Sequence, residues 1–310
     1  MITTVTLNAS VDKAYILEKP IELGSTQRVS RVINSAGGKG INVARIINLL
    51  GGEAKTTGFI GGFNGEYLVS LLEKDKIANE FVNVHGETRS CINILDGEHG
   101  STELLESGFA ITEYEENLFL AKFNRIIDDS YIICAGGSLP KGVSEDIYAK
   151  LITIAREKSK KLILDTSGDA LAKAISAKPF LIKPNSEELE QFFGKKFSTI
   201  EEKKQAGLQL LKMGAENVII SLGKDGALLL NEFGIYRGKT PDIKVINTVG
   251  SGDALVGGFA FAIDKGFDFL EAFRIAIAAG TANTLNENTG FFSIEDYGDI
   301  YQQVELERLA

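Results

Sequence analysis

The chain has 310 residues, of which 44% are hydrophobic and 24% charged, and its net charge of -9 argues against non-specific binding to nucleic acid. It contains no apolar run close to the ~20 residues of a transmembrane helix, so we expect neither a membrane span nor a membrane partner. The start of the chain lacks the basic segment of a signal peptide, and its two cysteines, Cys91 and Cys134, suggest no disulfide framework, so a cytoplasmic location is expected.

The first strand leads to an early candidate binding residue. Residues 2–7 alternate between apolar and polar side chains and predict a strand. Asp12 follows the loop after this strand, where its carboxylate could bind sugar hydroxyls or could simply stabilise a turn. Residues 13–33 and 89–106 show β-type alternation without a helical period. We therefore expect one domain over residues 1–310, with a small β-sheet inserted from these two segments as a lid.

A glycine-rich segment opens a helix between the two lid segments. Residues 37–40 read Gly-Gly-Lys-Gly and precede an apolar helical period that ends near Gly51. The unpaired amides of a helix start, together with Lys39, suit a phosphorylated or polyhydroxylated ligand. The same glycines could instead serve only the close packing of helix and sheet. The segment is neither a Walker A loop nor a dinucleotide motif, because Val43 stands where the third glycine of the latter belongs.

Strands and helices alternate regularly after Thr112. Four apolar runs are typical of strands buried on both faces of a parallel sheet: residues 131–135, 162–165, 180–183 and 217–222. This alternation predicts an α/β fold with a doubly wound, mostly parallel sheet flanked by helices. Ligands bind in such sheets near the carboxyl ends of the strands, where Ser138 and Lys183 are expected.

A second glycine turn, Asn-Thr-Val-Gly-Ser-Gly-Asp at residues 247–253, leads into an apolar helix. Its glycines allow a sharp bend, and the helix start offers unpaired amides to an anion. Asp253 could accept the proton of a hydroxyl that attacks a phosphoryl group, or it could be an ordinary acid that complements the helix dipole. A phosphate ligand would need local cations to overcome the negative net charge, and the candidates are Arg28, Lys39, Arg89 and Lys183.

Both glycine segments resemble the signatures of the ribokinase/PfkB family of carbohydrate kinases. Residues 36–44 are similar to the N-terminal signature, and residues 247–253 followed by Gly257-Gly258 are similar to the C-terminal one. Four further motifs lie between them in the family's order: Thr88-Arg89, residues 137–140, Lys183-Pro184-Asn185-x-x-Glu188 and residues 221–226. The resemblance covers nearly the whole chain and is greatest for the 1-phosphofructokinase and tagatose-6-phosphate kinase subfamilies.

The resemblance implies a ribokinase-like fold, ATP as co-substrate, Mg²⁺, and a sugar phosphate as acceptor. Asp253 would be the catalytic base, and Gly250, Ser251 and Gly252 would shape the anion hole for the migrating phosphoryl group. The implied substrate-binding residues are Asp12, Arg28, Gly38, Lys39, Asn42, Arg89 and Ser138. The residues implied to face ATP are Lys183, Asn185, Glu188, Ser221, Gly223, Gly226 and Asn283. Glu188 would also approach the metal through phosphate or water, although a helix cap formed by Asn185 and Glu188 would explain both residues alone.

Several alternatives stay open. Fructose 1-phosphate, giving fructose 1,6-bisphosphate, is the first candidate acceptor, and tagatose 6-phosphate is the second. A kinase for an unphosphorylated sugar is disfavoured by the cations Arg28, Lys39 and Arg89, and a non-catalytic binding protein by the intact Asp253. Some relatives bind potassium near the position of Asn247, where this chain lacks the usual aspartate, so a monovalent cation is an open question. The edges of the lid strands could pair between two subunits, which makes a homodimer a further hypothesis.

Overall fold

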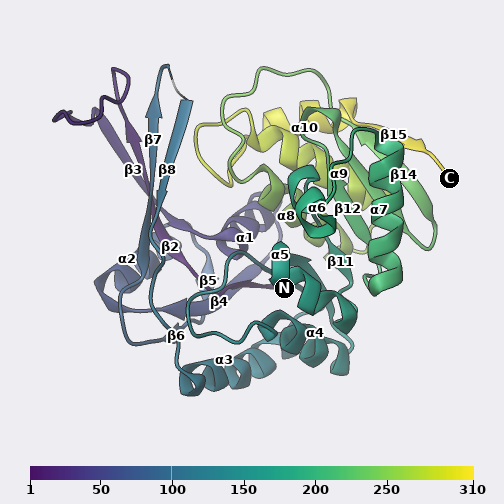
Figure 1. Cartoon of the computed structure of the whole chain (residues 1–310), viewed down its shortest axis with the longest axis horizontal. Helices are drawn as coiled ribbons and strands as arrows, with labels where there is room; N and C mark the ends of the chain where they lie inside the picture. Colours follow the sequence, from purple (N-terminus) through teal and green to yellow (C-terminus); the bar gives the residue numbers. More distant parts are fainter. Residues whose placement is uncertain (99) are drawn as a thin grey trace.

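The computed structural model describes residues 1–98 and 100–310 and contains one large and one small β-sheet (Figure 1). Residue 99, within the expected lid, lies outside this description. The strands of the large sheet are β1 (Ile2–Thr6), β4 (Ala54–Ile60), β5 (Ala78–Asn79), β6 (Val82–Asn83), β9 (Ile132–Gly136), β10 (Lys161–Asp165), β11 (Leu181–Ile182), β12 (Val218–Ser221), β13 (Ala227–Asn231), β14 (Gly234–Lys239) and β15 (Glu305–Arg308).

The large sheet is mostly parallel, as the sequence predicts. Its strand order is β15-β14-β13-β12-β11-β10-β9-β1-β4-β5, and β6 pairs with β4. Every pair from β5 to β12 is parallel, whereas β12 to β15 form an antiparallel edge. The order reverses direction at β1, so the chain winds outward on both sides of this strand, which is the doubly wound arrangement expected.

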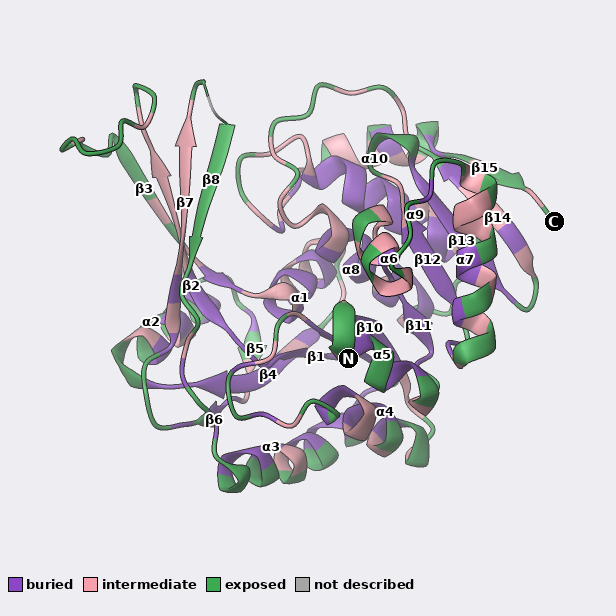
Figure 2. Ribbon diagram, in the orientation of Figure 1, coloured by how far each residue is buried: buried purple, intermediate pink, exposed green. Residues whose placement is uncertain are grey.

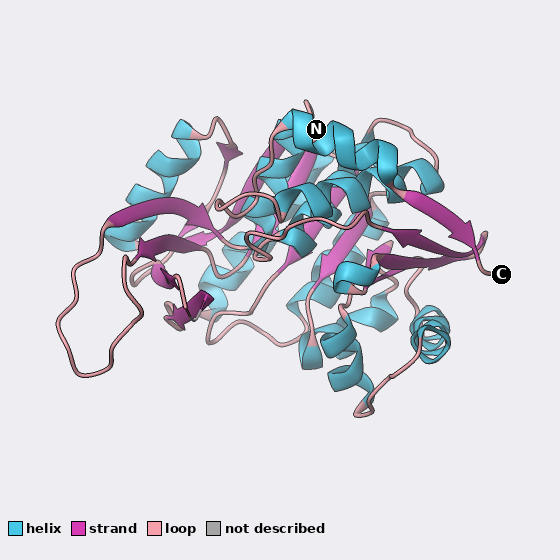
Figure 3. Cartoon of the chain, turned by 90° about the horizontal axis from the view of Figure 1, so that it is seen from above, coloured by secondary structure: helices cyan, strands magenta, loops and turns pink. Residues whose placement is uncertain are grey.

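Helices cover both faces of the large sheet (Figure 3). The helices are α1 (Lys39–Leu49), α2 (Gly62–Lys74), α3 (Glu113–Ile126), α4 (Ile147–Glu157), α5 (Gly168–Ala174), α6 (Ser186–Phe193), α7 (Ile200–Met213), α8 (Ser251–Asp264), α9 (Phe269–Asn283) and α10 (Ile294–Gln303). Among these helices, α1, α2, α8, α9 and α10 share one hydrophobic core, and α3 to α7 share the other. Strand β9 shows the division, because Ile132 and Cys134 join the first core while Ile133 and Ala135 join the second.

The small sheet stands beside the large one, at the left of Figure 1. It contains β2 (Ser10–Ile16), β3 (Arg31–Gly37), β7 (Arg89–Asp96) and β8 (Gly100–Leu105), in the order β3-β2-β7-β8. The two expected lid segments therefore do form a separate sheet, but residues 17–30 within the first are a loop and not a strand. The edge strand β8 is exposed throughout, as its green colour in Figure 2 shows.

Close packing at the base of the small sheet explains one of the glycines. Gly37 ends β3 opposite Ser10 of β2, and a Cβ built on Gly37 would lie 2.1 Å from the carboxylate of Asp12. Any side chain at position 37 would therefore displace Asp12. This glycine serves the placement of a carboxylate as well as the start of α1.

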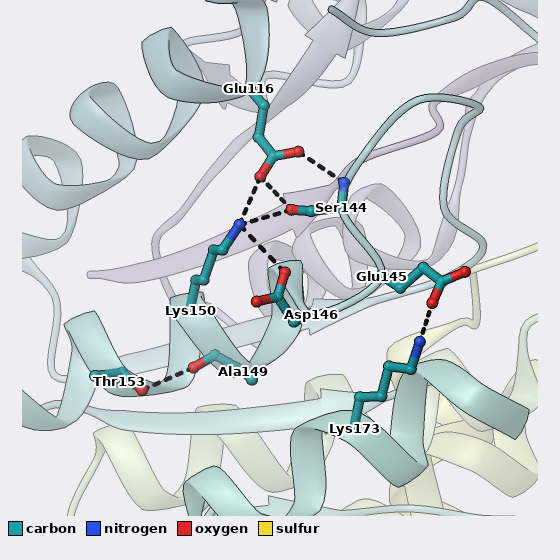
Figure 4. Close-up of polar contacts among 8 residues, drawn as sticks. All are labelled: Glu116, Ser144, Glu145, Asp146, Ala149, Lys150, Thr153 and Lys173. Atoms are coloured by element: carbon teal, nitrogen blue, oxygen red, sulfur yellow. Dashed lines mark hydrogen bonds and ion pairs between the residues drawn. The ribbon is translucent and has the colours of Figure 1, made fainter. Parts of the chain in front are cut away.

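A buried carboxylate on the face covered by α3 and α4 ties these two helices together (Figure 4). Glu116 of α3 is 6% exposed; it accepts hydrogen bonds from the amide of Ser144 at 2.7 Å, from the Ser144 hydroxyl, and from Lys150 of α4 at 3.0 Å. Burial raises the pKa of Glu116, but the bonds from Ser144 and Lys150 outweigh it and hold the pKa below its ordinary value of 4.5.

We expect Glu116→Ala to lower the free energy of unfolding by about 1–3 kcal/mol, because the Ser144 amide loses its acceptor. The lowered pKa means that this contribution is present above pH 4.5 and is lost as the pH falls below it. Urea unfolding at pH 7 and pH 4 would measure both effects. Glu145→Ala is the matched control, since Glu145 is 77% exposed where it pairs with Lys173 and should contribute less than about 1 kcal/mol. Equal losses for the two variants would contradict the prediction.

No helix in the described part of the chain combines the length and the apolar character that crossing a membrane requires.

Candidate active site

A cavity of about 580 Å³ lies between the small sheet and the edge of the large sheet where β1 and β9 end. The small sheet contributes Asp12 and Arg89 to its lining, and the main domain contributes Lys39, Asn42 and Asp253. Gly38 and Ser138 also line it. The structure thus gathers six of the seven expected substrate-binding residues around the expected base. The position at the carboxyl ends of parallel strands is the one that α/β sheets use for ligands.

Asp253 lies in the first turn of α8 and is 7% exposed. The Asn42 amide nitrogen, from α1, donates a hydrogen bond of 2.8 Å to its Oδ2. Its other oxygen accepts no hydrogen bond from the residues that the structure describes. Burial raises the pKa of Asp253 to about 6; Lys39, Asn42 and Lys183 act against this rise and the nearby Asp165 acts with it. A buried carboxylate with one oxygen held and a pKa near neutrality is suited to accept a proton.

The turn before α8 has the geometry that its glycines predict. Gly250 adopts a φ of 78°, in the left-handed region, and a Cβ there would lie 2.6 Å from the Thr289 side chain. Within the described residues no side chain caps the first amides of α8. The Ser251 amide donates to the Thr248 carbonyl at 3.2 Å, whereas the amides of Gly252 and Asp253 have no acceptor in the described hydrogen bonds and can face an anion at the positive end of the helix dipole.

A buried carboxylate that the sequence analysis did not select joins the two expected lysines. Asp165, at the end of β10, is 3% exposed and lies 3.0 Å from the Lys39 amine and 3.4 Å from the Lys183 amine. Burial alone would raise the pKa of Asp165, but Lys183 and Lys39 hold it below its ordinary value. Burial acts to lower the pKa of Lys39, yet Asp165, with help from Asp253 and Glu188, raises it. Lys39 therefore carries its charge at the cavity, and the Lys183 amine lies beside the same carboxylate.

Asp12 and Arg89 form the small-sheet wall of the cavity. Ser10 donates a hydrogen bond of 2.6 Å to Asp12. Burial raises the pKa of Asp12, while Ser10 and the charge of Arg89 act in the opposite direction. The Arg89 guanidinium donates to the backbone oxygens of Asn8, at 3.0 and 3.2 Å, and Glu106, at 3.2 Å. Arg89 is thus held by the backbone without a tight carboxylate partner in the described hydrogen bonds, which leaves its charge available to a ligand.

The residues expected to face ATP are not among those that line this cavity; they lie at or beyond the ends of the neighbouring strands β11 and β12 and at the end of α9. Lys183 lies beside the turn, since a Cβ built on Gly252 would be 3.1 Å from its amine. Asn185 and Glu188 form a reciprocal capping box at the start of α6, with bonds of 2.8 and 2.9 Å, as the cap interpretation predicts. The remaining positions are Ser221 at the end of β12, and Gly223 and Gly226 in the turn that follows.

Two expected site residues are placed differently from the rest. Arg28 is exposed on the 17–30 loop and is not among the described residues that line the cavity. Asn283 is fully buried, and its amide group bonds Val249, Gly290 and Phe291 at 2.9, 2.9 and 3.2 Å. Asn283 thereby supports the backbone that leads into the Gly250 turn, and its contact with a nucleotide stays a prediction.

The described residues fit a metal ion that arrives with phosphate. No group of three or more histidine, cysteine, aspartate or glutamate side chains in residues 1–98 and 100–310 is arranged to hold a metal by itself. Magnesium commonly binds through one or two carboxylates together with substrate phosphates and water. Glu188 supplies a carboxylate close enough to Lys39 to raise its pKa, and Asp165 lies beside both lysines. The donor set therefore suits a phosphate-bound Mg²⁺.

The chain is similar to known proteins over almost its whole length. Residues 5–296 match the family model described as pfkB family carbohydrate kinase. The chain is 37% identical over 291 residues to the 1-phosphofructokinase of Bacillus subtilis, with 94% of each chain covered. It is 37% identical over 309 residues to the tagatose-6-phosphate kinase of Staphylococcus epidermidis, with 99% of each covered. A crystal structure of phosphofructokinase-2 from Escherichia coli with potassium superposes with a TM-score of 0.91 at 32% identity, covering 97% of this chain and 98% of that one.

Proposed function

Because the chain belongs to the pfkB family of carbohydrate kinases, we propose that it transfers the γ-phosphoryl group of ATP to a hydroxyl of fructose 1-phosphate, giving fructose 1,6-bisphosphate and ADP. The observation that carries this proposal is the position of Asp253, at an uncapped helix start, in a cavity that the cationic side chains Lys39 and Arg89 also line. The similarity of the chain to a tagatose-6-phosphate kinase supports tagatose 6-phosphate as the second candidate acceptor.

In the proposed reaction the acceptor hydroxyl lies against the unbonded oxygen of Asp253. Asp253 takes the proton as the hydroxyl oxygen attacks the γ-phosphorus, and the bond from that phosphorus to the bridging oxygen of ADP breaks. The amides at the start of α8 and the Lys183 amine lie where negative charge spreads over the transferring group. Mg²⁺, carried by the ATP phosphates with Glu188 nearby, would neutralise part of this charge.

Residues from both walls of the cavity would hold the acceptor. Lys39 and Arg89 would bind its existing phosphate together with Ser138, and the carboxylate of Asp12 would accept hydrogen bonds from its other hydroxyls. A Cβ on Gly38 would lie 2.4 Å from the Thr6 side chain, so a glycine at this position allows the close packing of the cavity lining. An acceptor with a phosphate at one end and a primary hydroxyl at the other would meet these cations with the first group and Asp253 with the second. An unphosphorylated sugar would offer no negative charge to Arg89, which has no tight carboxylate partner in the described hydrogen bonds.

A coupled assay of ADP release over a panel of acceptors tests the proposal. We expect turnover with fructose 1-phosphate or tagatose 6-phosphate and far lower kcat/KM with fructose. Preference for tagatose 6-phosphate would select the second candidate, and preference for fructose itself would contradict the role of Lys39 and Arg89 in binding a phosphate. A complete lack of ADP formation with every sugar phosphate would favour the non-catalytic alternative.

Arg89→Ala is expected to raise KM for the sugar phosphate by about 10–100-fold, the equivalent of one charged hydrogen bond of ~1.5–3 kcal/mol, and to leave KM for ATP nearly unchanged. Initial rates with each substrate varied in turn would measure the two constants. Arg125→Ala is the control, because this arginine pairs with Glu80 at 3.1 Å on an exposed surface. Similar changes in both KM values would show that Arg89 does not hold the acceptor phosphate.

The rate should fall in acid because Asp253 must be ionised to accept a proton. Its pKa of about 6 predicts that kcat/KM is lost as the pH falls through 6, two pH units above the ordinary range of an aspartate. The pH profile of kcat/KM under fixed ionic strength would show this limb. A profile that stays flat down to pH 5 would contradict the assignment of the base.

Two further proposals concern partners. Val32 at the edge strand β3 and Leu104 and Leu105 on β8 are 49%, 54% and 63% exposed, which supports a homodimer through the small sheet.

Asn247 bonds the Val249 amide and the Glu287 carbonyl, and the potassium in the Escherichia coli structure motivates a test of monovalent cation dependence. Light scattering would measure the oligomeric state, and activity assays in sodium or potassium salts would measure the cation dependence.

A further inference from the structure

An arginine that the sequence analysis did not select lines the cavity beside Asn42, the residue that bonds the proposed base. Arg45 of α1 has a side chain that is only 12% exposed, and it is one helical turn after Asn42. Its guanidinium donates to the Asn42 Oδ1 at 3.0 Å and to the Ala36 carbonyl at 2.9 Å, and it pairs with Asp75 at 3.1 Å. One side chain therefore touches the end of β3, the end of α2 and the residue that bonds Asp253.

The contact between Arg45 and Asn42 decides which way the Asn42 amide faces. An arginine side chain has only donors, so the group that meets it must be the amide oxygen. The amide nitrogen of Asn42 then faces the other way, where it donates to Asp253 Oδ2 at 2.8 Å. Asn42 is 6% exposed, so water cannot easily take the place of either partner.

The opposite orientation would be unfavourable. A flipped Asn42 would turn its oxygen toward the Asp253 carboxylate and its NH₂ group toward the guanidinium, so both contacts would become repulsive. Without Arg45, a flipped Asn42 would still bring its oxygen against the Asp253 carboxylate, but its NH₂ group would no longer meet a guanidinium. The flipped orientation would therefore cost less, and the amide could turn more easily. Asp253 would then lose the bond that holds one of its oxygens and orients the other.

We propose that Arg45 is a positioning residue for phosphoryl transfer: it fixes the Asn42 amide, so that Asn42 holds Oδ2 of Asp253 and leaves Oδ1 for the acceptor hydroxyl. This inference rests on the proposed function, since it needs Asp253 as the base. The other charged groups that face Asp253 are Lys39 on α1, Asp165 at the end of β10 and Lys183 after β11. None of them donates to Asp253 in the described hydrogen bonds, so Asn42 alone holds its orientation there.

A double-mutant cycle tests this chain of contacts. Arg45→Met and Asn42→Ala should each lower kcat by about tenfold, a fraction of the ~10²–10⁴ that general base catalysis supplies. If Arg45 acts through Asn42, adding Arg45→Met to Asn42→Ala should cause little further loss. The acid limb of the kcat/KM profile should also move to higher pH in Arg45→Met, because the Asn42 bond favours the ionised form of Asp253.

Two more variants separate positioning from folding. Arg156→Met is the matched control: Arg156 donates to the Lys178 carbonyl at 3.0 Å and pairs with Glu216, far from the cavity lining. It should keep the wild-type kcat and pH profile. Arg45→Lys retains one donor for Asn42 and should recover part of the activity even if Arg45→Met folds poorly.

The outcomes are distinct. An unchanged kcat in Arg45→Met, or an equal tenfold loss when it is added to Asn42→Ala, would overturn the inference while the kinase reaction itself stands. A loss of kcat with an unmoved acid limb would show that Arg45 acts only on the fold, and would overturn it as well. A wild-type protein that forms no ADP with any acceptor would remove the proposed function, and with it the base that Arg45 is inferred to position.

Discussion

Replacement of Asp253 by asparagine is expected to lower kcat by about 10³-fold, within the ~10²–10⁴ range that a positioned general base contributes. Asparagine has nearly the same shape and can keep a hydrogen bond to Asn42, but it cannot take a proton from the acceptor hydroxyl. Binding of ATP and of the sugar phosphate should persist, because their phosphates are proposed to meet the helix amides, Lys183, Lys39 and Arg89. Steady-state kinetics and ligand-induced shifts in Tm would measure catalysis and binding separately.

Asp264→Asn provides the control for this experiment. Asp264 lies at the opposite end of α8 and is 3.9 Å from the amino group of Met1. Its replacement changes the same functional group on the same helix without approaching the cavity, so kcat should stay at the wild-type value. Near-normal turnover in Asp253→Asn would show that another group removes the proton.

Asp165→Asn is expected to lower the free energy of unfolding by about 3–5 kcal/mol, the usual cost of leaving a buried charge without its partner. The Lys183 amine is the costly group, because its side chain is 4% exposed and Asp165 is its paired carboxylate in the described structure. Lys39, which Asp165 also contacts, is 34% exposed and can turn toward water. Urea unfolding of the variant and the wild type would give the difference.

The phosphates of ATP offer a second readout for this variant. If Lys183 faces the nucleotide, bound MgATP supplies the negative charge that Asp165→Asn removes, and it should raise Tm more in the variant than in the wild type. Asp128→Asn, which breaks a surface pair with Lys158, should change stability by less than about 1 kcal/mol and should not alter the response to ATP. An Asp165→Asn protein as stable as the wild type would contradict the role given to this carboxylate.

The fold could be predicted from the sequence wherever burial left a pattern. The apolar runs that become β9, β10 and β12 are buried on both faces, so their composition alone distinguishes them from surface strands. Strand β15 leaves no such pattern, because three of its four residues are exposed and include Glu305 and Glu307. It exists because the edge of β14 offers unpaired backbone groups, which is a property of the assembled sheet.

The site could be predicted only as far as local motifs reach. The glycine turns and their charged neighbours are continuous in sequence, so Lys39, Asn42 and Asp253 could be selected together. Asp165 looks like the polar end of an ordinary strand, and its contact with Lys39 joins residues 126 positions apart. One signal could have found it: a carboxylate directly after a fully buried parallel strand lies at the sheet edge where ligands bind.

The junction between the small sheet and α1 has a mechanical consequence. Strand β3 ends at Gly37 and α1 begins at Lys39, so Gly38, with a φ of 115°, is the single residue between them. A rotation of the small sheet must either be absorbed by the torsions of Gly38 or tilt the helix that carries Lys39 and Asn42. A residue with less torsional freedom at position 38 would transmit a rotation of the small sheet to α1. A ligand that displaced the small-sheet wall of the cavity would then also move Lys39 and Asn42.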